Sequence, residues 1–513
     1  MRGINPAGLF CYVALFLAGC GPQAPAEAPA EAPAATPSAQ AGDVATTARP
    51  DAVPAQAAAP ANEANATIEI RGVTLPPYRE VVLDNGARLF LMEKRDVPLV
   101  AFHASLRGGV VAEAASRNGS AALTADLLAQ GAGERGARSF AEAVSSVGGR
   151  FDTRAELEAL VVTGEFMRED ADLMVELLAD VLRRPNLDEG EFDKLRARAV
   201  QSLSAAKDSD LRSLIKPYAQ AFVHGDHPYG RAISGSEASL ATLSHEDILA
   251  YHRNHVGADR LQLTVVGDFD ADKLAARLGE AFGDWQAAAE PWVAVPPPKA
   301  AKGGRVLLVD KPGAAQTYFW VGNLGVAHAD PETPAVDLVN TLFGGRFTSM
   351  LNNALRVESG LTYGARSLLE RPTQPGSVGM FSFCATENTT AALDLALAQL
   401  ALLHGDGFDE QTLASGRNYI LGTYTLGLET GPQMAEALAQ LKFFDEADAV
   451  FNDYASRVAA IDGGAAEAVV ERVYPTREES VFVFIGDADA IRGEVEQYGT
   501  ITELPISAPV FSP

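Results

Sequence analysis

Arg356 and Tyr363 are the residues whose types and spacing best suit chemistry at an oxygen atom. A guanidinium and a phenol both donate hydrogen bonds, and two such donors stabilise an oxygen that gains negative charge. The sequence predicts a helix over about 348–358, a stop at Gly360 and a strand from about Thr362. A helix end and a strand start can direct both side chains into one space, which neither element alone would do. The alternative is that Arg356 only caps its helix and Tyr363 fills a core.

This pair lies in the most distinctive motif of the chain, which runs from Leu342 to Gly364 and begins Leu-Phe-Gly-Gly-Arg-Phe-Thr-Ser. Further motifs are His227-Pro-Tyr-Gly230 and Val265-Val-Gly-Asp-Phe269. These stretches, spread over about residues 75 to 490, resemble the pitrilysin/insulinase (inverzincin) metallopeptidases. The resemblance implies that Arg356 and Tyr363 reach an active site and hydrogen-bond the substrate carbonyl beside the scissile bond.

The metal-binding helix of that family corresponds to residues 119–132, where the family carries H-x-x-E-H. Two imidazoles there hold Zn²⁺ and a glutamate activates water. The corresponding residues here are Ala122, Ala125 and Asp126, and the position of the third ligand falls on Gln201 and Ser202. A methyl group neither binds a metal nor takes a proton, and one carboxylate without imidazole or thiolate companions holds Zn²⁺ feebly. We therefore expect no metal, no cofactor and no catalytic residue of its own in this chain.

The resemblance implies a non-catalytic, substrate-binding subunit that forms a heterodimer with a zinc-bearing relative and acts with it on peptides. It is similar to the Arg/Tyr-bearing subunits of bacterial two-subunit peptidases and of mitochondrial processing peptidase. Only Gly344 and Gly345 stand where the mitochondrial subunit has an extended glycine-rich loop, so the bacterial enzymes are the closer model. A peptide in such a complex adds as a strand to a sheet edge. The alternative is a structural or peptide-holding protein with no peptidase partner.

The first twenty residues predict a secretory leader. The apolar run from Leu9 to Cys20 is too short for a bilayer, which needs about 20 helical residues. Leu17-Ala-Gly-Cys20 resembles a lipobox, which implies that Cys20 is acylated and holds the chain at the membrane. Gly21 in place of an acidic residue favours the periplasmic face of the outer membrane. The alternative is a soluble secreted protein cut near Gly21.

Composition and repeats predict the domain organisation. After the leader (1–20), residues 21–66 are rich in Ala and Pro and predict a disordered tether. Leu263–Ala271 recurs as Phe482–Ala490, which predicts tandem domains at 67–285 and 304–503, with a linker at 286–303 and a tail at 504–513. Hairpins followed by grouped helices predict an α+β fold, each domain an antiparallel sheet with helices on one face.

Four further patterns carry less weight. A net charge of −26 makes nucleic acid an unsuitable partner. Gly131-Ala-Gly-Glu-Arg-Gly136 has the letters of a dinucleotide loop but follows a helix instead of a strand. His224 with His227, and His252 with His255, lack a third ligand by sequence, so surface or hydrogen-bonded histidines are expected. Ser139-Phe-Ala-Glu142 predicts a capping box that opens a helix.

Overall fold

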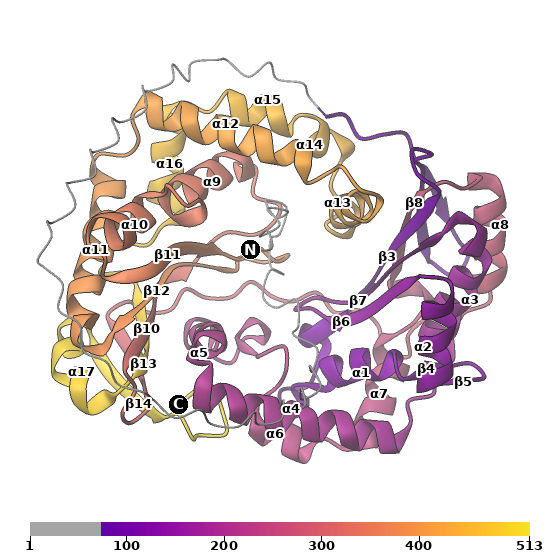
Figure 1. The fold of residues 1–513 in the computed structure, drawn as a ribbon, viewed down its shortest axis with the longest axis horizontal. Coiled ribbons are helices and arrows are strands. Elements are labelled where there is room, and N and C mark those ends of the chain that lie inside the picture. Colours follow the sequence, from indigo (N-terminus) through magenta and orange to yellow (C-terminus); the bar gives the residue numbers. More distant parts are fainter. Residues whose placement is uncertain (1–72) are drawn as a thin grey trace, which may run out of the picture. The chain divides into compact units, whose positions relative to one another are not determined.

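Each half of the chain builds one six-stranded sheet in the computed structural model, which describes residues 73–513 (Figure 1). The first sheet contains, in spatial order, β1 (Arg79–Val82), β2 (Arg88–Glu93), β8 (Leu261–Gly267), β3 (Leu99–Arg107), β7 (Ala159–Met167) and β6 (Arg150–Ala155). The second contains β11 (Thr362–Leu369), β12 (Ser377–Ala385), β10 (Gln316–Leu324), β13 (Val481–Gly486), β9 (Arg305–Asp310) and β14 (Thr500–Pro505).

The two sheets follow the same plan. β2 runs parallel to β8, and β8, β3, β7 and β6 continue as antiparallel neighbours. In the second sheet β9 runs parallel to β13, and β13, β10, β12 and β11 continue in the same way. Only one edge differs, because β1 forms a hairpin with β2 whereas β14 runs parallel to β9. The predicted α+β fold with two related domains is confirmed, but the sheets are mixed instead of antiparallel throughout.

Helices fill the sequence between the strands. The first half contains α1 (Ser120–Leu128), α2 (Ala137–Ser146), α3 (Ala171–Arg183), α4 (Glu189–Ser209), α5 (Leu211–His224), α6 (Glu237–Thr242), α7 (His245–His255) and α8 (Ala271–Phe282). The second half contains α9 (Thr333–Asn340), α10 (Met350–Asn352), α11 (Thr389–Gly405), α12 (Glu410–Leu426), α13 (Gly431–Phe443), α14 (Asp448–Asn452), α15 (Tyr454–Ala459), α16 (Gly463–Val473) and α17 (Ala488–Val495). None of the helices within residues 73–513 is both long enough and apolar enough to cross a bilayer.

Local sequence signals explain several boundaries. Gly86 has a φ of +92° in the β1–β2 turn, a conformation that glycine adopts without strain. Ser244 and Asp247 form a capping box at the start of α7. The expected capping box at Ser139 is wrong: α2 starts at Ala137 with Gly136 as its N-cap, so Ser139 lies inside the first turn. The glycine motif folds as a short hairpin of β4 (Gly131–Ala132) and β5 (Arg135–Gly136).

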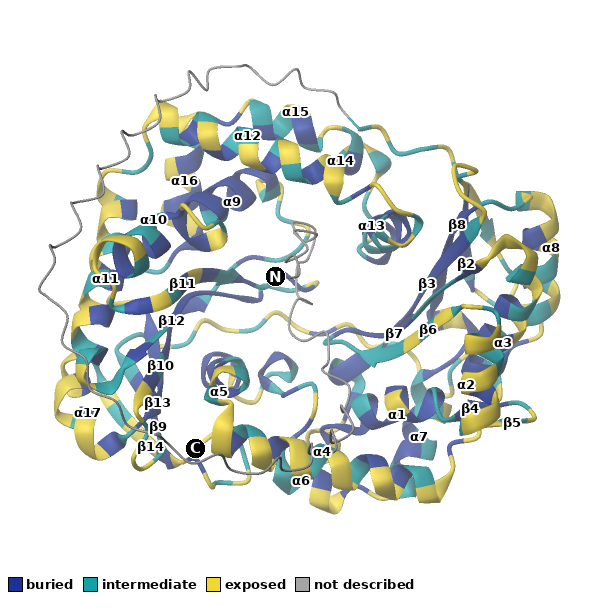
Figure 2. Cartoon of the chain, in the orientation of Figure 1, coloured by how far each residue is buried: buried dark blue, intermediate teal, exposed yellow. Residues whose placement is uncertain are grey.

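One helix from each half packs on the sheet of the other half. α5 packs against β10 and β13, and α13 packs against β3 and β8. In the second sheet the core therefore combines side chains from both halves, namely Tyr218, Phe222, Trp320, Val481 and Val483. Phe90, Met92 and Val266 of the first sheet share a cluster with Met434, Leu438 and Leu441 of α13. Both sheets are thus covered on two faces, not on one as expected, and their strands are largely buried (Figure 2).

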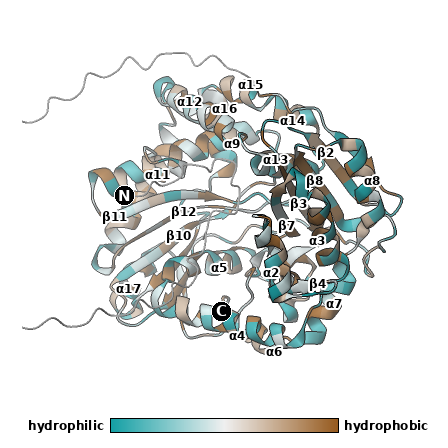
Figure 3. Cartoon of the chain, turned by 45° about the vertical axis from the view of Figure 1, so that its right-hand side comes forward, coloured by the Kyte–Doolittle hydropathy of each residue, from teal (hydrophilic) through white to brown (hydrophobic). Residues whose placement is uncertain are grey.

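Apolar strands make this double coverage favourable. β3, β7 and β8 are strongly hydrophobic (Figure 3), and all residues of β8 are buried. A strand that is buried on both faces reads as a continuous apolar run instead of an alternating one. α5 and α13 each cover apolar surface on the sheet of the opposite half and remove it from water. The described residues therefore belong to one compact unit.

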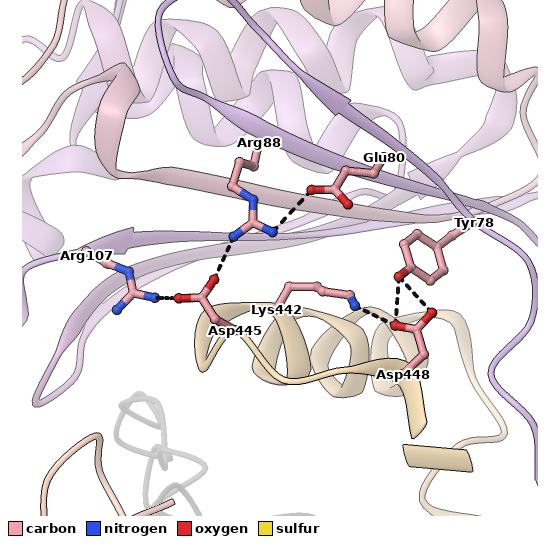
Figure 4. A network of polar contacts seen from close by, with 7 residues as sticks. All are labelled: Tyr78, Glu80, Arg88, Arg107, Lys442, Asp445 and Asp448. Atoms are coloured by element: carbon pink, nitrogen blue, oxygen red, sulfur yellow. Dashed lines mark hydrogen bonds and ion pairs between the residues drawn. The ribbon is translucent and has the colours of Figure 1, made fainter. Parts of the chain in front are cut away.

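Polar contacts fasten the end of α13 to the first sheet (Figure 4). The Asp445 carboxylate bridges Arg88, at 2.8 Å, and Arg107, at 3.0 Å. Asp448 accepts hydrogen bonds from Lys442 at 2.5 Å and from the Tyr78 hydroxyl at 2.8 Å. Asp445 has a φ of +54°, in the left-handed region where residues other than glycine are uncommon.

The segment between α8 and β9 contains no helix or strand. The predicted leader (1–20), its Cys20 and the predicted tether (21–66) lie outside the described residues.

Candidate functional site

The Arg356/Tyr363 segment is built from irregular helical turns followed by an edge strand. Ser349 caps α10, which continues as a π-helical turn over Asn353–Glu358, and Gly360 ends it with a φ of +66°. β11 then begins at Thr362, as the sequence predicted. π-helical turns of this kind are frequent at functional sites.

Glycine lets a second π-helical turn, Thr341–Gly345, pack closely against β11. A Cβ atom placed on Gly344 would lie 2.1 Å from the backbone nitrogen of Ser367, a distance that no side chain tolerates. Glycine is therefore needed at position 344 because this turn approaches β11 closely.

The structure brings Arg356 and Tyr363 together. The guanidinium carbon of Arg356 lies 4.6 Å from the centroid of the Tyr363 ring and 4.9 Å from that of Phe347. Tyr363 is 76% exposed and Phe347 is 61% exposed, so neither ring fills a core. Among the described residues Arg356 makes no hydrogen bond to a helix carbonyl and no ion pair. The half-exposed guanidinium thus lies near two exposed aromatic rings.

A β-bulge turns Tyr363 outward. The register of β11 against β12 skips between Thr362 and Ala365, which leaves Tyr363 and Gly364 opposite Phe383. The Ser382 hydroxyl lies within hydrogen-bond distance of the Gly364 carbonyl, at 3.1 Å, and of the Thr362 hydroxyl, at 3.0 Å. These contacts fix the irregular backbone.

Sequence reasoning missed Phe347 and Asn352. The Asn352 amide donates to the Phe347 carbonyl at 2.6 Å, and its side-chain oxygen accepts from the Ala365 backbone N–H at 3.5 Å. Asn352 therefore ties the Phe347 turn to β11. The sequence signal for Phe347 was its position. A large apolar residue follows shortly after Gly344 and Gly345, just before the predicted helix over 348–358, and no predicted element buries it.

The helix that replaces the zinc motif is α1, and it is held without a metal. Ala125 is buried, Ala122 is half-buried and the Asp126 side chain reaches solvent. The Thr153 hydroxyl donates to the Ala125 carbonyl at 2.7 Å, which joins α1 to the edge strand β6. Desolvation by the surrounding chain, with a contribution from Asp152, raises the pKa of Asp126 to about 6 against the opposing effect of Arg198.

Glu113, which the sequence did not single out, fixes the start of α1. Its buried carboxylate accepts hydrogen bonds from the Ala121 backbone N–H at 2.7 Å, the Gly119 N–H at 3.1 Å and the Asn118 amide at 2.8 Å. Burial raises the pKa of Glu113 to about 7, although these donors favour the charged form. The residues around α1 do not fit a zinc ion, because two of the three family positions on the helix carry methyl groups.

The four histidines make local structural contacts. His227 Nε2 lies 2.8 Å from the Pro296 carbonyl, and its Nδ1 accepts from the Tyr229 N–H at 3.1 Å. Burial lowers the pKa of His224 to about 4, and His227 lowers it further. His252 Nε2 lies 3.2 Å from the Leu182 carbonyl, and burial lowers the pKa of His255. Over residues 73–513 there is no group of three or more His, Cys, Asp or Glu side chains arranged to hold a metal.

The His227-Pro-Tyr-Gly230 motif joins the two halves. The Tyr229 hydroxyl donates to Glu158 at 2.6 Å and accepts from the Gln374 N–H at 3.0 Å. The other oxygen of the buried Glu158 accepts from the backbone N–H and the hydroxyl of Thr373, at 2.8 and 2.9 Å. This motif therefore positions the second domain against the first.

Both halves match models of one family. Residues 93–236 match the model of the insulinase family of peptidases, M16, and residues 242–420 match the model described as the peptidase M16 inactive domain. The two matches together cover more than half of the chain. The chain belongs to the M16 peptidase family. The resemblance drawn from the motifs is thereby confirmed.

Relatives of this M16 protein have divergent names. An uncharacterized zinc protease of Mycobacterium leprae is 25% identical over 62% of this chain and 71% of its own length. A non-peptidase homolog of Helicobacter pylori is 24% identical over 66% of this chain and 78% of its own length. The second name agrees with Ala122 and Ala125 at the metal positions and, with the match of residues 242–420 to an inactive domain, supports an inactive member of the M16 family.

Solved structures share the fold. A peptidase M16 inactive domain from Pseudomonas fluorescens superposes with a TM-score of 0.74 at 18% identity, over 80% of this chain and 98% of that one. The periplasmic protease PqqL of Escherichia coli gives a TM-score of 0.69 at 15% identity, over 85% of this chain and 48% of PqqL. The M16 protein described here thus spans about half the length of PqqL.

Proposed function

We propose that this M16 protein is a non-catalytic, substrate-binding subunit of a two-component zinc peptidase that acts on peptides or unstructured segments. The observation that carries the proposal is the contact between the half-exposed Arg356 and the exposed Tyr363. A zinc-bearing M16 relative would supply the metal and the activated water. This chain would supply two hydrogen-bond donors to the carbonyl oxygen beside the bond that breaks, where negative charge develops.

The edge of the second sheet suits an extended peptide. β11 is the outer strand of its sheet, and within residues 73–513 no strand pairs with its free side. An extended segment can add to such an edge through main-chain hydrogen bonds, while side-chain pockets set preference. Because Tyr363 projects from a bulge of the same strand, a peptide paired with β11 would pass directly by the Arg356/Tyr363 pair.

For location we propose the periplasm, with a lipid on Cys20 that holds the chain at the outer membrane. The lipobox resemblance supports this location, and PqqL, which shares the fold, is described as a periplasmic protease. The anchoring and the choice of membrane rest on the leader alone.

The second candidate is a structural or peptide-holding protein without a peptidase partner. The name of the Helicobacter pylori relative favours it, because that protein is called a non-peptidase homolog. The two candidates differ in whether the exposed Arg356/Tyr363 pair participates in bond cleavage.

The test is peptidase activity on a quenched, unstructured fluorogenic peptide. The purified chain is assayed alone and mixed with an M16 relative from the same genome that carries an intact H-x-x-E-H, each with and without a chelator. Activity that rises strongly only in the mixture, and disappears with the chelator, supports the two-component peptidase. Chelator-sensitive cleavage by this chain alone contradicts a non-catalytic role. Cleavage that is the same with and without this chain favours the second candidate.

A further inference from the structure

A cationic, aromatic surface lies on the second sheet beside α5. Tyr318 on β10 and Phe383 on β12 are directly paired, and their rings stack with centroids 5.3 Å apart and planes inclined by 15°. The guanidinium carbon of Arg212, from the exchanged helix α5, lies 5.8 Å from the centroid of Phe383 and 5.9 Å from that of Phe381. The second half thus contributes the aromatic rings, and the first half contributes the arginine that lies over them.

A second cation joins this surface. Arg366 on β11 is directly paired with Phe381, so its side chain lies on the same face of the sheet. Arg212 lies over the Phe381 ring and Arg366 is paired with Phe381, so the two arginines share one aromatic neighbour. Burial lowers the pKa of Arg366, and the positive charge of Arg212 lowers it further.

Neither arginine forms a salt bridge within residues 73–513, although burial and the nearby Asp210 carboxylate raise the pKa of Tyr318 on the same surface against the opposing effect of Arg212. Within the described residues, Arg212 and Arg366 have no carboxylate within ion-pair distance and make no hydrogen bond. Other arginines of this chain, such as Arg472 and Arg492, pair directly with carboxylates. The positive charges of two arginines near one aromatic ring repel each other, and a bound anion relieves that repulsion.

We propose that Arg212 and Arg366 form a carboxylate-binding subsite for peptides, a role that rests on the proposed function. Guanidinium groups bind carboxylates through paired hydrogen bonds, and both arginines are exposed and therefore accessible to a peptide. The carboxylate comes either from an acidic side chain within the peptide or from its C-terminus.

The position of the subsite predicts where the carboxylate lies in the peptide. Tyr363 and Arg366 are on one strand, opposite Phe383 and Phe381, respectively. A strand advances about 3.3 Å per residue, so a peptide paired with β11 places its carboxylate roughly two to three residues from the bond beside Tyr363.

The test measures binding of fluorescein-labelled, unstructured peptides to the full chain by anisotropy, without a partner. Three peptides of one length are compared: one with an internal Glu and an amidated end, one with Gln and an amidated end, and one with Gln and a free C-terminal carboxylate. We expect a carboxylate peptide to bind about tenfold more tightly than the neutral peptide, because charge-assisted hydrogen bonds to arginine are strong. Whether the Glu peptide or the free-ended peptide gains identifies the source of the carboxylate.

Variants separate the subsite from general charge attraction. Arg212→Gln and Arg366→Gln should each reduce the preference several-fold and together abolish it, while Arg366→Lys should retain part of it. The matched control is Arg138→Gln, an exposed arginine on α2 that forms only a surface pair with Glu142 and should leave the preference unchanged. Equal binding of all three peptides, or a preference that survives the double variant, overturns the subsite but leaves the proposed function standing. Failure of every peptide to bind overturns both.

Discussion

The two halves of the molecule use one sheet plan but differ in the segment that follows the equivalent strands β3 and β10. In the first half that segment leads to α1, a regular helix with Ala122 and Ala125 at the metal positions and a buried carboxylate at its start. In the second half it leads to α9 and two π-helical turns; Phe347 lies between the turns, and Arg356 lies in the second of them, near both Phe347 and Tyr363. The comparison teaches that equivalent strands support very different chemistry, because the connecting segments decide which side chains reach solvent.

The largest effect expected from this comparison concerns turnover. In the mixture with a zinc-bearing relative, Arg356→Ala and Tyr363→Phe should each lower kcat/KM by roughly 10- to 1000-fold, as loss of an oxyanion-type donor does. Size-exclusion chromatography should show that the complex still assembles, since Tyr363 is exposed and Arg356 is half-exposed, so neither belongs to the core.

The matched control lies on α1. Asp126→Asn removes the carboxylate at the position of the lost zinc motif and should leave kcat/KM within about twofold. That change corresponds to only a fraction of the transition-state stabilisation expected from Arg356 and Tyr363. A loss as large as that of Arg356→Ala would mean that the first half takes part in chemistry, and the division between the halves would be wrong.

The next effect is on stability and concerns Glu113. The folded state raises the pKa of this carboxyl from about 4.5 to about 7, so between these values the folded state binds more protons than the unfolded state. The free energy of unfolding therefore falls as the pH rises through this window, by at most about 3 kcal/mol from this group. Glu113→Gln cannot titrate, so urea unfolding at a series of pH values from 4 to 8 should show a flatter profile for the variant.

The equivalent segment of the second half provides the contrast. Its helix start is capped by the hydroxyl of Ser349, which does not titrate in this range. Ser349→Ala should lower stability by about 1 kcal/mol at every pH, without altering the shape of the profile. A pH profile of Glu113→Gln that parallels the wild type would show that the carboxyl is not the source of the pH dependence.

Local sequence patterns predicted the candidate site more completely than they predicted how the two halves pack together. A helix, a glycine stop and a strand are encoded over about 348–364, so the meeting of Arg356 and Tyr363 could be predicted from one short stretch. The sequence contained no sign that α5 and α13 pack on each other's sheets, because helical periodicity shows an apolar face but not which sheet that face meets. The parallel pairs β2/β8 and β9/β13 were missed for the same reason, since they join strands far apart in the chain.

Two misses have narrower causes. Ser139 has the right spacing to Glu142 for a capping box, but the chain leaves the β4–β5 hairpin early enough to start α2 at Ala137. Phe347 was not singled out because a large apolar residue usually indicates a core, and its exposure depends on the π-helical turns on either side of it.

A smaller effect is expected at the contact between α13 and the first sheet. Asp445→Ala removes both ion pairs shown in Figure 4 and keeps a residue with a side chain at a φ of +54°, which should cost about 1 kcal/mol or slightly more. Asp445→Gly removes the same ion pairs but relieves the backbone, so it should cost less than the alanine variant. Thermal unfolding of the two variants gives the order directly. A glycine variant less stable than the alanine variant would mean that the left-handed backbone at 445 is not strained.

The smallest effect concerns Phe347. It tests whether this ring holds the Arg356 guanidinium in its orientation before a substrate binds. Phe347→Leu keeps an apolar side chain but removes one of the two aromatic faces that hold the Arg356 guanidinium. A cation–π contact at an exposed site contributes about 0.5–1 kcal/mol, so kcat should fall about two- to fivefold with little change in KM. Phe347→Trp should restore kcat, and Leu426→Ala, an exposed apolar residue on α12, should have no effect. An increase in KM alone would make Phe347 a substrate contact, whereas a fall in kcat that tryptophan restores would make it the residue that orients Arg356.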